Sequence, residues 1–142
     1  MAERYEEEIS RSLRRIVRSI EQYNRRFSER TKLTVSQCMA LRELKTTGSC
    51  TAGELADRVG ISRGTVTGIL DQLQSEDLVR RRRRPKDRRR VYVSLTQLGR
   101  RLASELQAPF EEPLAKLLDE LPEDARSQTA EALRRVARVF ES

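Results

Sequence analysis

The sequence predicts a mainly α-helical fold that carries one small β-hairpin. Apolar residues recur every three or four positions through most of the 142 residues, which is the spacing of amphipathic helices. A single stretch, from Val91 to Leu95, alternates apolar and polar side chains with the period of a strand. The length favours one domain, and no apolar run approaches the roughly 20 residues that a membrane span needs.

Two helices are expected in the N-terminal third. An apolar stripe from Tyr5 to Phe27 predicts a helix of about 23 residues and about 35 Å, longer than a small domain needs for its own core. The capping box Thr34–Gln37 predicts the start of a second helix, and Thr47–Ser49 its end. Its apolar stripe consists of Ala40, Leu41 and Leu44.

Residues 51–73 have the spacing of a helix-turn-helix. A capping box at Thr51–Glu54 opens one short helix, and Ser62 caps the next. Ala56 is small where the two helices would cross, and Gly60 tolerates the positive φ that the turn requires. The inward positions are apolar: Leu55, Val59, Ile61, Val66 and Ile69. An ordinary αα-hairpin has a similar pattern, but the basic segment directly downstream favours the helix-turn-helix.

The basic segment, Arg80–Arg90, is predicted to form most of the β-hairpin. Leu78 and Val79 lead into it, and its tip is expected near Pro85, which presets the backbone of a turn. The segment contains eight Arg, one Lys and one Asp, so the other 131 residues hold 20 basic and 21 acidic side chains. The net charge of +7 therefore comes from eleven residues.

Such a concentration of positive charge destabilises the folded protein through self-repulsion when no partner neutralises it. It therefore favours a polyanionic partner. A merely solubilising run is the alternative. The near-exclusive use of Arg indicates nucleic acid, because the planar guanidinium binds two phosphate oxygens at once. No apolar face accompanies the run, so a membrane partner is not expected.

The C-terminal third is predicted to be helical. Thr96 caps a fifth helix that runs through Leu118, with a kink or a break at Pro109 and Pro113. Leu121–Asp124 has the pattern of a helix start, and a last apolar stripe follows it.

One face of the fourth helix is expected to enter the major groove of DNA. Its outward residues are Ser62, Arg63, Thr65, Thr67 and Gly68. Thr51, at the start of the preceding helix, is also expected to contact DNA. Arg63 can form a bidentate pair with guanine, and threonine methyls can contact thymine methyls. Gly64 and Gly68 each cost about 1 kcal/mol within a helix. They indicate either a close approach of bare backbone to DNA or close packing against another helix.

At this point the sequence resembles the MarR family of winged helix-turn-helix transcription regulators. The resemblance covers the order of elements along nearly the whole chain. It rests on the helix-turn-helix, on Leu33-Thr34, Gln37, Leu41 and Leu44, and on the pattern Pro85-x-Asp87-x-Arg89-x-Val91-x-Val93-x-Leu95-Thr96-x-x-Gly99. It implies a winged helix DNA-binding lobe at residues 33–99, with dimerisation helices at 1–32 and 100–142.

The resemblance also implies a homodimer on a pseudo-palindromic operator. Arg89 would enter the minor groove at the hairpin tip, oriented by Asp87, while neighbouring basic residues contact phosphates. Strand alternation turns only about half of the strand arginines toward DNA. The hairpin residues expected at DNA are Arg82, Arg84, Lys86, Asp87, Arg88 and Arg89. Independently of the family, the apolar stripes of the first, fifth and sixth helices would expose a large apolar surface unless a second copy covered them.

A small amphipathic effector, often phenolic or anionic in this family, is implied more weakly. Tyr23 and Phe27 are its candidate contacts, although dimer packing explains them equally well. Some relatives instead sense oxidants through a cysteine. Cys38 is expected to be an inert core thiol, and Cys50, in the turn before the helix-turn-helix, is the better redox candidate.

The predicted function is that of a cytoplasmic, nucleoid-associated transcriptional repressor. The alternatives are a non-specific architectural or RNA-binding winged-helix protein and a cysteine-based redox regulator. The chain has no histidine, its two cysteines lie twelve residues apart, and its acids are scattered along helices. We therefore expect no enzyme activity, no metal site and no cofactor.

Overall fold

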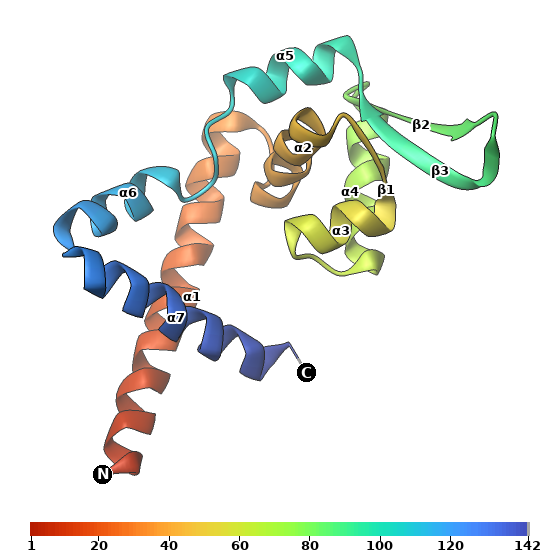
Figure 1. The fold of residues 1–142 in the computed structure, drawn as a ribbon. Coiled ribbons are helices and arrows are strands. Elements are labelled where there is room, and N and C mark those ends of the chain that lie inside the picture. The colour runs from red at the N-terminus through yellow and green to blue at the C-terminus, as the bar shows by residue number, and fades with distance from the viewer. Residues whose placement is uncertain (142) are drawn as a thin grey trace. The chain divides into compact units, whose positions relative to one another are not determined.

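The computed structural model describes residues 1–141. Along them, the elements are α1 (Ala2–Thr31), α2 (Val35–Thr47), β1 (Ser49–Thr51), α3 (Ala52–Val59), α4 (Arg63–Ser75), β2 (Val79–Arg84), β3 (Asp87–Leu95), α5 (Gln97–Glu105), α6 (Glu111–Glu120) and α7 (Glu123–Phe140) (Figure 1). Met1–Leu106 form one compact unit, and a second unit begins at Gln107 and contains α6 and α7. The predicted class, mainly helical with a small β-hairpin, is confirmed.

The core of the first unit lies where α2, α3 and α4 meet the sheet. Its largest side chains are almost completely buried, and most of them are leucines. Burial of one leucine side chain stabilises the fold by roughly 1.5–3 kcal/mol. The most deeply buried leucines are Leu41, Leu44, Leu55, Leu70 and Leu73. These leucines come from all three helices, so the core holds the helix-turn-helix and the sheet together as one body.

Four helices of this unit begin where the sequence predicts. The side-chain oxygens of Thr34, Thr51, Ser62 and Thr96 each accept a hydrogen bond from the backbone N–H three residues later. At Thr34 the box is reciprocal, because the Gln37 side chain accepts from the Thr34 N–H at 3.0 Å. Each cap satisfies a backbone donor that the helix itself leaves without a partner.

The sheet is antiparallel with the order β1-β3-β2. The hairpin of β2 and β3 turns at Pro85 and Lys86, as predicted. The third strand, β1, is not predicted by the sequence: Cys50 pairs with Val93 where a turn is expected. A strand of three residues carries no alternation that could identify it, and pairing with β3 defines it.

Helix α1 is longer than predicted, since it has 30 residues and ends where Lys32 adopts a left-handed conformation at φ 63°. Phe27, near its C-terminal end, is buried. Apolar residues earlier in the helix are exposed: Tyr5, Ile9, Ile16, Val17 and Ile20. The core of the first unit therefore does not use this stripe.

The predicted fifth helix is broken, which decides between the kink and the break. Helix α5 ends at Glu105, and α6 begins at Glu111, two residues after Pro109. Pro113 lies in the first turn of α6, where a missing N–H is tolerated. Phe110 precedes α6 in a left-handed conformation at φ 65°.

Gly99 fixes how α5 joins the sheet. A Cβ at this position would lie 2.0 Å from the carbonyl oxygen of Leu78, closer than van der Waals contact permits. The same carbonyl accepts a hydrogen bond from the Thr96 N–H at 3.0 Å. Only glycine therefore allows α5 to start this close to the segment that enters β2.

Candidate nucleic-acid interface

The turn between α3 and α4 has the geometry of a helix-turn-helix. Gly60 ends α3 at φ 78°, and its N–H donates to the Ala56 carbonyl at 2.9 Å. Ile61 donates to the same carbonyl at 3.0 Å, and the Ala56 side chain is fully buried. Both residues predicted to enable the turn therefore do so, one by its positive φ and the other by its small size.

The first turn of α4 is exposed and internally braced. Ser62 Oγ accepts the Thr65 N–H at 3.1 Å and lies 2.7 Å from Thr65 Oγ1. Thr67 Oγ1 lies 3.4 Å from the Arg63 carbonyl oxygen to which it donates. These predicted residues therefore form one solvent-facing surface with local hydrogen bonds among them.

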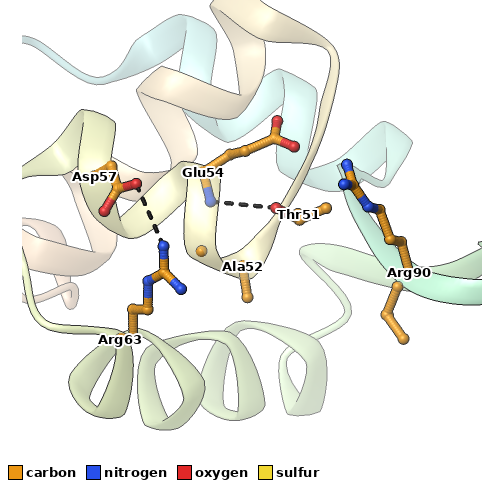
Figure 2. A pocket seen from close by; sticks show the side chains of 8 residues that line it. Thr51, Ala52, Glu54, Asp57, Arg63 and Arg90 are labelled. Atoms are coloured by element: carbon orange, nitrogen blue, oxygen red, sulfur yellow. Dashed lines mark hydrogen bonds and ion pairs between the residues drawn. The ribbon is translucent and has the colours of Figure 1, made fainter.

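Arg63 turns toward α3 rather than along its own helix. Its Nη2 lies 3.7 Å from Asp57 Oδ2, and its Cζ lies 3.5 Å from the position that a Cβ on Gly53 would occupy. Figure 2 shows the guanidinium between the two helices. The group lines an open pocket of about 520 Å³ together with Thr51, Glu54, Arg90 and Val91. A Cβ at position 53 would be in ordinary van der Waals contact with the guanidinium.

Gly64 and Gly68 face open space. A Cβ built on either residue would meet no atom within 4 Å outside its own local helix backbone. Packing against another helix of this chain, one of the two explanations open from the sequence, is therefore wrong for the described residues. Bare backbone therefore faces outward at both positions.

The arginines of β2 point alternately to two faces. Arg81 lies on the face of the buried Val79 and contacts α4, with its Nη1 at 2.7 Å from Asp71 Oδ1. Arg82, which pairs with Tyr92, lies on the other face, and the register shifts between Arg83 and Arg84. Arg84 stacks over the Tyr92 ring at 3.8 Å. The hairpin thus separates one inward arginine from the exposed ones.

At the hairpin tip, Asp87 organises the backbone. Its Oδ1 accepts the Arg89 N–H at 3.2 Å, and its Oδ2 lies 3.9 Å from Arg90 Nε. Lys86, Arg88 and Arg89 are exposed. The contact between Asp87 and Arg89 expected from the family therefore reaches the Arg89 backbone, while the ion pair forms with Arg90.

The two cysteines are buried. Burial raises the pKa of both thiols. At Cys50 a hydrogen bond with Thr47 and the charge of Arg58 oppose this shift, but each has a smaller effect than burial. The expectation that Cys50 lies in the turn before the helix-turn-helix is wrong, because it lies in strand β1 and its side chain is buried in the core. A protonated, covered thiol reacts slowly with oxidants, which argues against a redox role for either residue.

The candidate effector contacts lie together near the end of α1. The rings of Tyr23 and Phe27 are 6.1 Å apart and inclined by 25°, and the Arg30 guanidinium lies 5.9 Å from the Phe27 ring centroid. Neither aromatic lines the pocket beside Arg63. Over residues 1–141 there is no cluster of three potential metal-binding side chains, and no helix is long and apolar enough to cross a membrane.

Sequence reasoning missed three residues at this interface. Asp57 and Asp71 look like ordinary charges on helix faces, and Arg81 is one arginine in a run of five. The signal for Arg81 was strand alternation, because Val79 is apolar and Arg81 is two residues further along the same face. The acidic partners had no signal, since each is defined by contact with another element.

A helix-turn-helix followed by a sheet with a basic β-hairpin defines the winged helix class of DNA-binding proteins. The hairpin of β2 and β3 is the wing. The family model described as MarR family matches residues 33–91, and the chain belongs to the MarR family of transcription regulators.

Known proteins resemble the chain over most of its length. An HTH-type transcriptional regulator of Bacillus subtilis, YsmB, is 30% identical over 117 residues, which are 82% of this chain and 80% of that protein. The transcriptional repressor MdtR of the same organism is 29% identical over 135 residues, covering 95% and 87%. A crystal structure of mutant MarR from E. coli with operator DNA superposes with a TM-score of 0.67 at 25% identity, covering 88% of this chain and 93% of that one.

Proposed function

We propose that the chain is a repressor that binds a pseudo-palindromic DNA operator as a homodimer and is released by a small amphipathic effector. The observation that carries the proposal is the placement of two unpacked glycines on the exposed face of α4, beside a hairpin that holds the net positive charge. Repression is supported by the related repressor MdtR.

In this proposal α4 enters the major groove. The exposed residues Ser62, Thr65 and Thr67 contact bases or phosphates, and Arg63 leaves Asp57 to form a bidentate pair with guanine. Gly64 and Gly68 let the helix backbone approach the groove wall. Thr51, at the start of α3, contacts the phosphate backbone.

The wing contacts the DNA beside that groove. Arg89 enters the minor groove, with its backbone held by Asp87. The neighbouring exposed cations are proposed to contact phosphates: Arg82, Arg84, Lys86 and Arg88. Their contribution is electrostatic and independent of sequence, so they supply affinity rather than discrimination.

Dimerisation is supported by apolar side chains that the chain leaves exposed. On α1 they include Ile9, Ile16 and Val17, on α6 Leu114 and Leu117, and on α7 Leu133 and Phe140. Covering them with the same stripes of a second copy would remove a large apolar surface from water. Residues 1–32 and 100–142 would supply the dimer contacts, and residues 33–99 the DNA-binding lobe.

The effector is the least constrained part of the proposal. The family resemblance suggests a phenolic or anionic compound, and Tyr23 and Phe27 offer aromatic faces near the end of α1. Binding would reduce operator affinity by favouring a lobe spacing that does not match two half-sites.

Footprinting on the region upstream of the chain's own gene tests the proposal. We expect a protected pseudo-palindrome, and a panel of phenolic carboxylic acids should contain compounds that abolish the protection. If a dimer neutralises about eight phosphates, log K should fall against log salt with a slope of about −7. Equal binding to random duplex, or preference for RNA, would instead indicate an architectural or RNA-binding protein.

A further inference from the structure

Arg81 differs from every other arginine of the wing in its surroundings. Its side chain is 26% exposed, and it follows the buried Val79 on the inner face of β2. Nη1 donates to Asp71 Oδ1 at 2.7 Å, and Nη2 lies 3.3 Å from the Thr67 carbonyl oxygen to which it donates. One guanidinium therefore connects β2 to two residues of α4 that are one helical turn apart.

Arg81 and Asp71 both affect how this surface would interact with phosphates. Two of the five N–H donors of Arg81 are engaged by protein acceptors, and most of the side chain is covered, so it is less available to phosphates than the exposed arginines of the wing. Asp71 lies one turn after Thr67 and is 62% exposed, so without a partner it would repel an approaching phosphate backbone. The ion pair neutralises this carboxylate and at the same time fixes where the wing begins relative to α4.

We infer that Arg81 is a positioning residue for sequence discrimination: it couples the wing to α4, and it is not a DNA ligand. This inference rests on the proposed function, because it assumes that α4 and the wing contact adjacent grooves. A wing that is free to shift relative to α4 can still find phosphates, but it holds the base-reading residues in register less well. Arg81 therefore affects the preference for one duplex over another.

Binding of the footprinted duplex and of a random duplex of equal length, each measured across salt concentrations, tests the inference. We expect Arg81→Ala to reduce the ratio of the two affinities about five- to tenfold while leaving the salt slope unchanged. Arg82→Ala is the matched control, because Arg82 is adjacent in sequence but lies on the opposite strand face. It should reduce the slope by about 0.9 per protomer and leave the ratio unchanged.

Asp71→Ala, which removes both the charge and the acceptor oxygen, separates positioning from simple electrostatics. Loss of an acidic charge near DNA raises affinity for all duplexes equally and leaves the ratio unchanged. Loss of the coupling lowers the ratio as much as Arg81→Ala does, and combining the two substitutions lowers it no further. Arg81→Lys should give an intermediate ratio, because an ammonium keeps the charge but cannot span both acceptors in the same geometry.

Circular dichroism and thermal melting of each variant establish that the fold is retained. A reduced salt slope in Arg81→Ala with an unchanged ratio would overturn the inference and make Arg81 a phosphate ligand. An unchanged ratio in Asp71→Ala would also overturn it. A wild-type protein that binds both duplexes equally would overturn the proposed sequence reading, and with it this inference; discrimination by the wild type that survives in Arg81→Ala would overturn the inference alone.

Discussion

Arg63 and Asp57 form an ion pair that joins the first residue of α4 to α3, with 3.7 Å between Nη2 and Oδ2. Both side chains are more than two-thirds exposed, so the pair stabilises the fold little. In the proposed complex the guanidinium leaves Asp57 for a guanine edge, which presents two acceptors.

Arg63→Ala should relax operator specificity and cost about 1–3 kcal/mol of binding free energy on the preferred duplex. The loss should concentrate at one base pair in each half-site, because a bidentate contact distinguishes guanine from the other bases. Binding to duplexes altered singly at each position measures it. A uniform loss across all duplexes would show that Arg63 binds phosphate.

Gly68→Ala should change stability and DNA affinity in opposite directions. Open space around the position means that alanine adds helix propensity without a clash, about 1 kcal/mol, which raises Tm by about 2–4 °C. The added methyl group should weaken operator binding, because it holds the backbone away from the groove. Thermal melting and a binding titration on the same preparation measure both effects.

Gly99→Ala is the control for that experiment. Its methyl group would meet the Leu78 carbonyl at 2.0 Å, so the substitution should lower stability by about 1–3 kcal/mol. Unchanged DNA affinity for Gly68→Ala would contradict a close approach of α4 to DNA.

At the wing tip, Arg89→Ala should weaken operator binding more than Asp87→Ala does. Arg89 is proposed to enter the minor groove itself, whereas Asp87 acts through the Arg89 N–H that it accepts at 3.2 Å. Fluorescence anisotropy with a labelled duplex distinguishes the two. The opposite order would mean that the shape of the turn matters more than the Arg89 side chain.

Ile16→Glu should dissociate the proposed dimer. Ile16 lies in the exposed apolar stripe of α1, and a carboxylate buried between two copies without a partner is strongly unfavourable. Light scattering after size-exclusion chromatography should give the mass of one chain for this variant and of two for the wild type. Arg18→Glu places the same charge on the opposite side of the helix and should leave the mass unchanged.

The thiols should be unreactive in the folded protein. Burial raises both pKa values above the ordinary 9.0. Between pH 9 and the raised values, the folded protein therefore keeps both thiol protons while the unfolded chain has lost them. Their contribution to stability is therefore complete below pH 9 and is lost as pH rises through the raised values. A thiol reagent should react fully only in denaturant, and peroxide should leave the footprint intact; rapid labelling of Cys50 in the native state would restore the redox hypothesis.

Features set by neighbours in sequence could be predicted, and features set by contacts between elements could not. Caps such as Thr34 and Ser62, and the turn at Gly60, depend on three or four adjacent residues. Strand β1 exists because Cys50 meets Val93 from across the sheet, which no local pattern records.

The site follows the same rule. The outward residues of α4 follow from helix periodicity, so Thr65 and Gly68 lie where expected. The acidic partner of each arginine depends on tertiary structure: Arg63 contacts Asp57 on another helix, and Arg81 contacts Asp71. A run of identical residues hides such differences, since only the fold decides which arginine turns inward.

Separation of charge along the chain has a consequence for how the protein finds a duplex. Nine of the cations occupy the eleven residues around the wing tip, while the other 131 residues sum to −1. The excess positive charge is thus confined to the wing, and the field of a nucleic acid attracts that part of the molecule most strongly before contact. The wing should therefore face the nucleic acid when the two molecules first meet. Association should be faster as a result, because fewer encounters have an unproductive orientation.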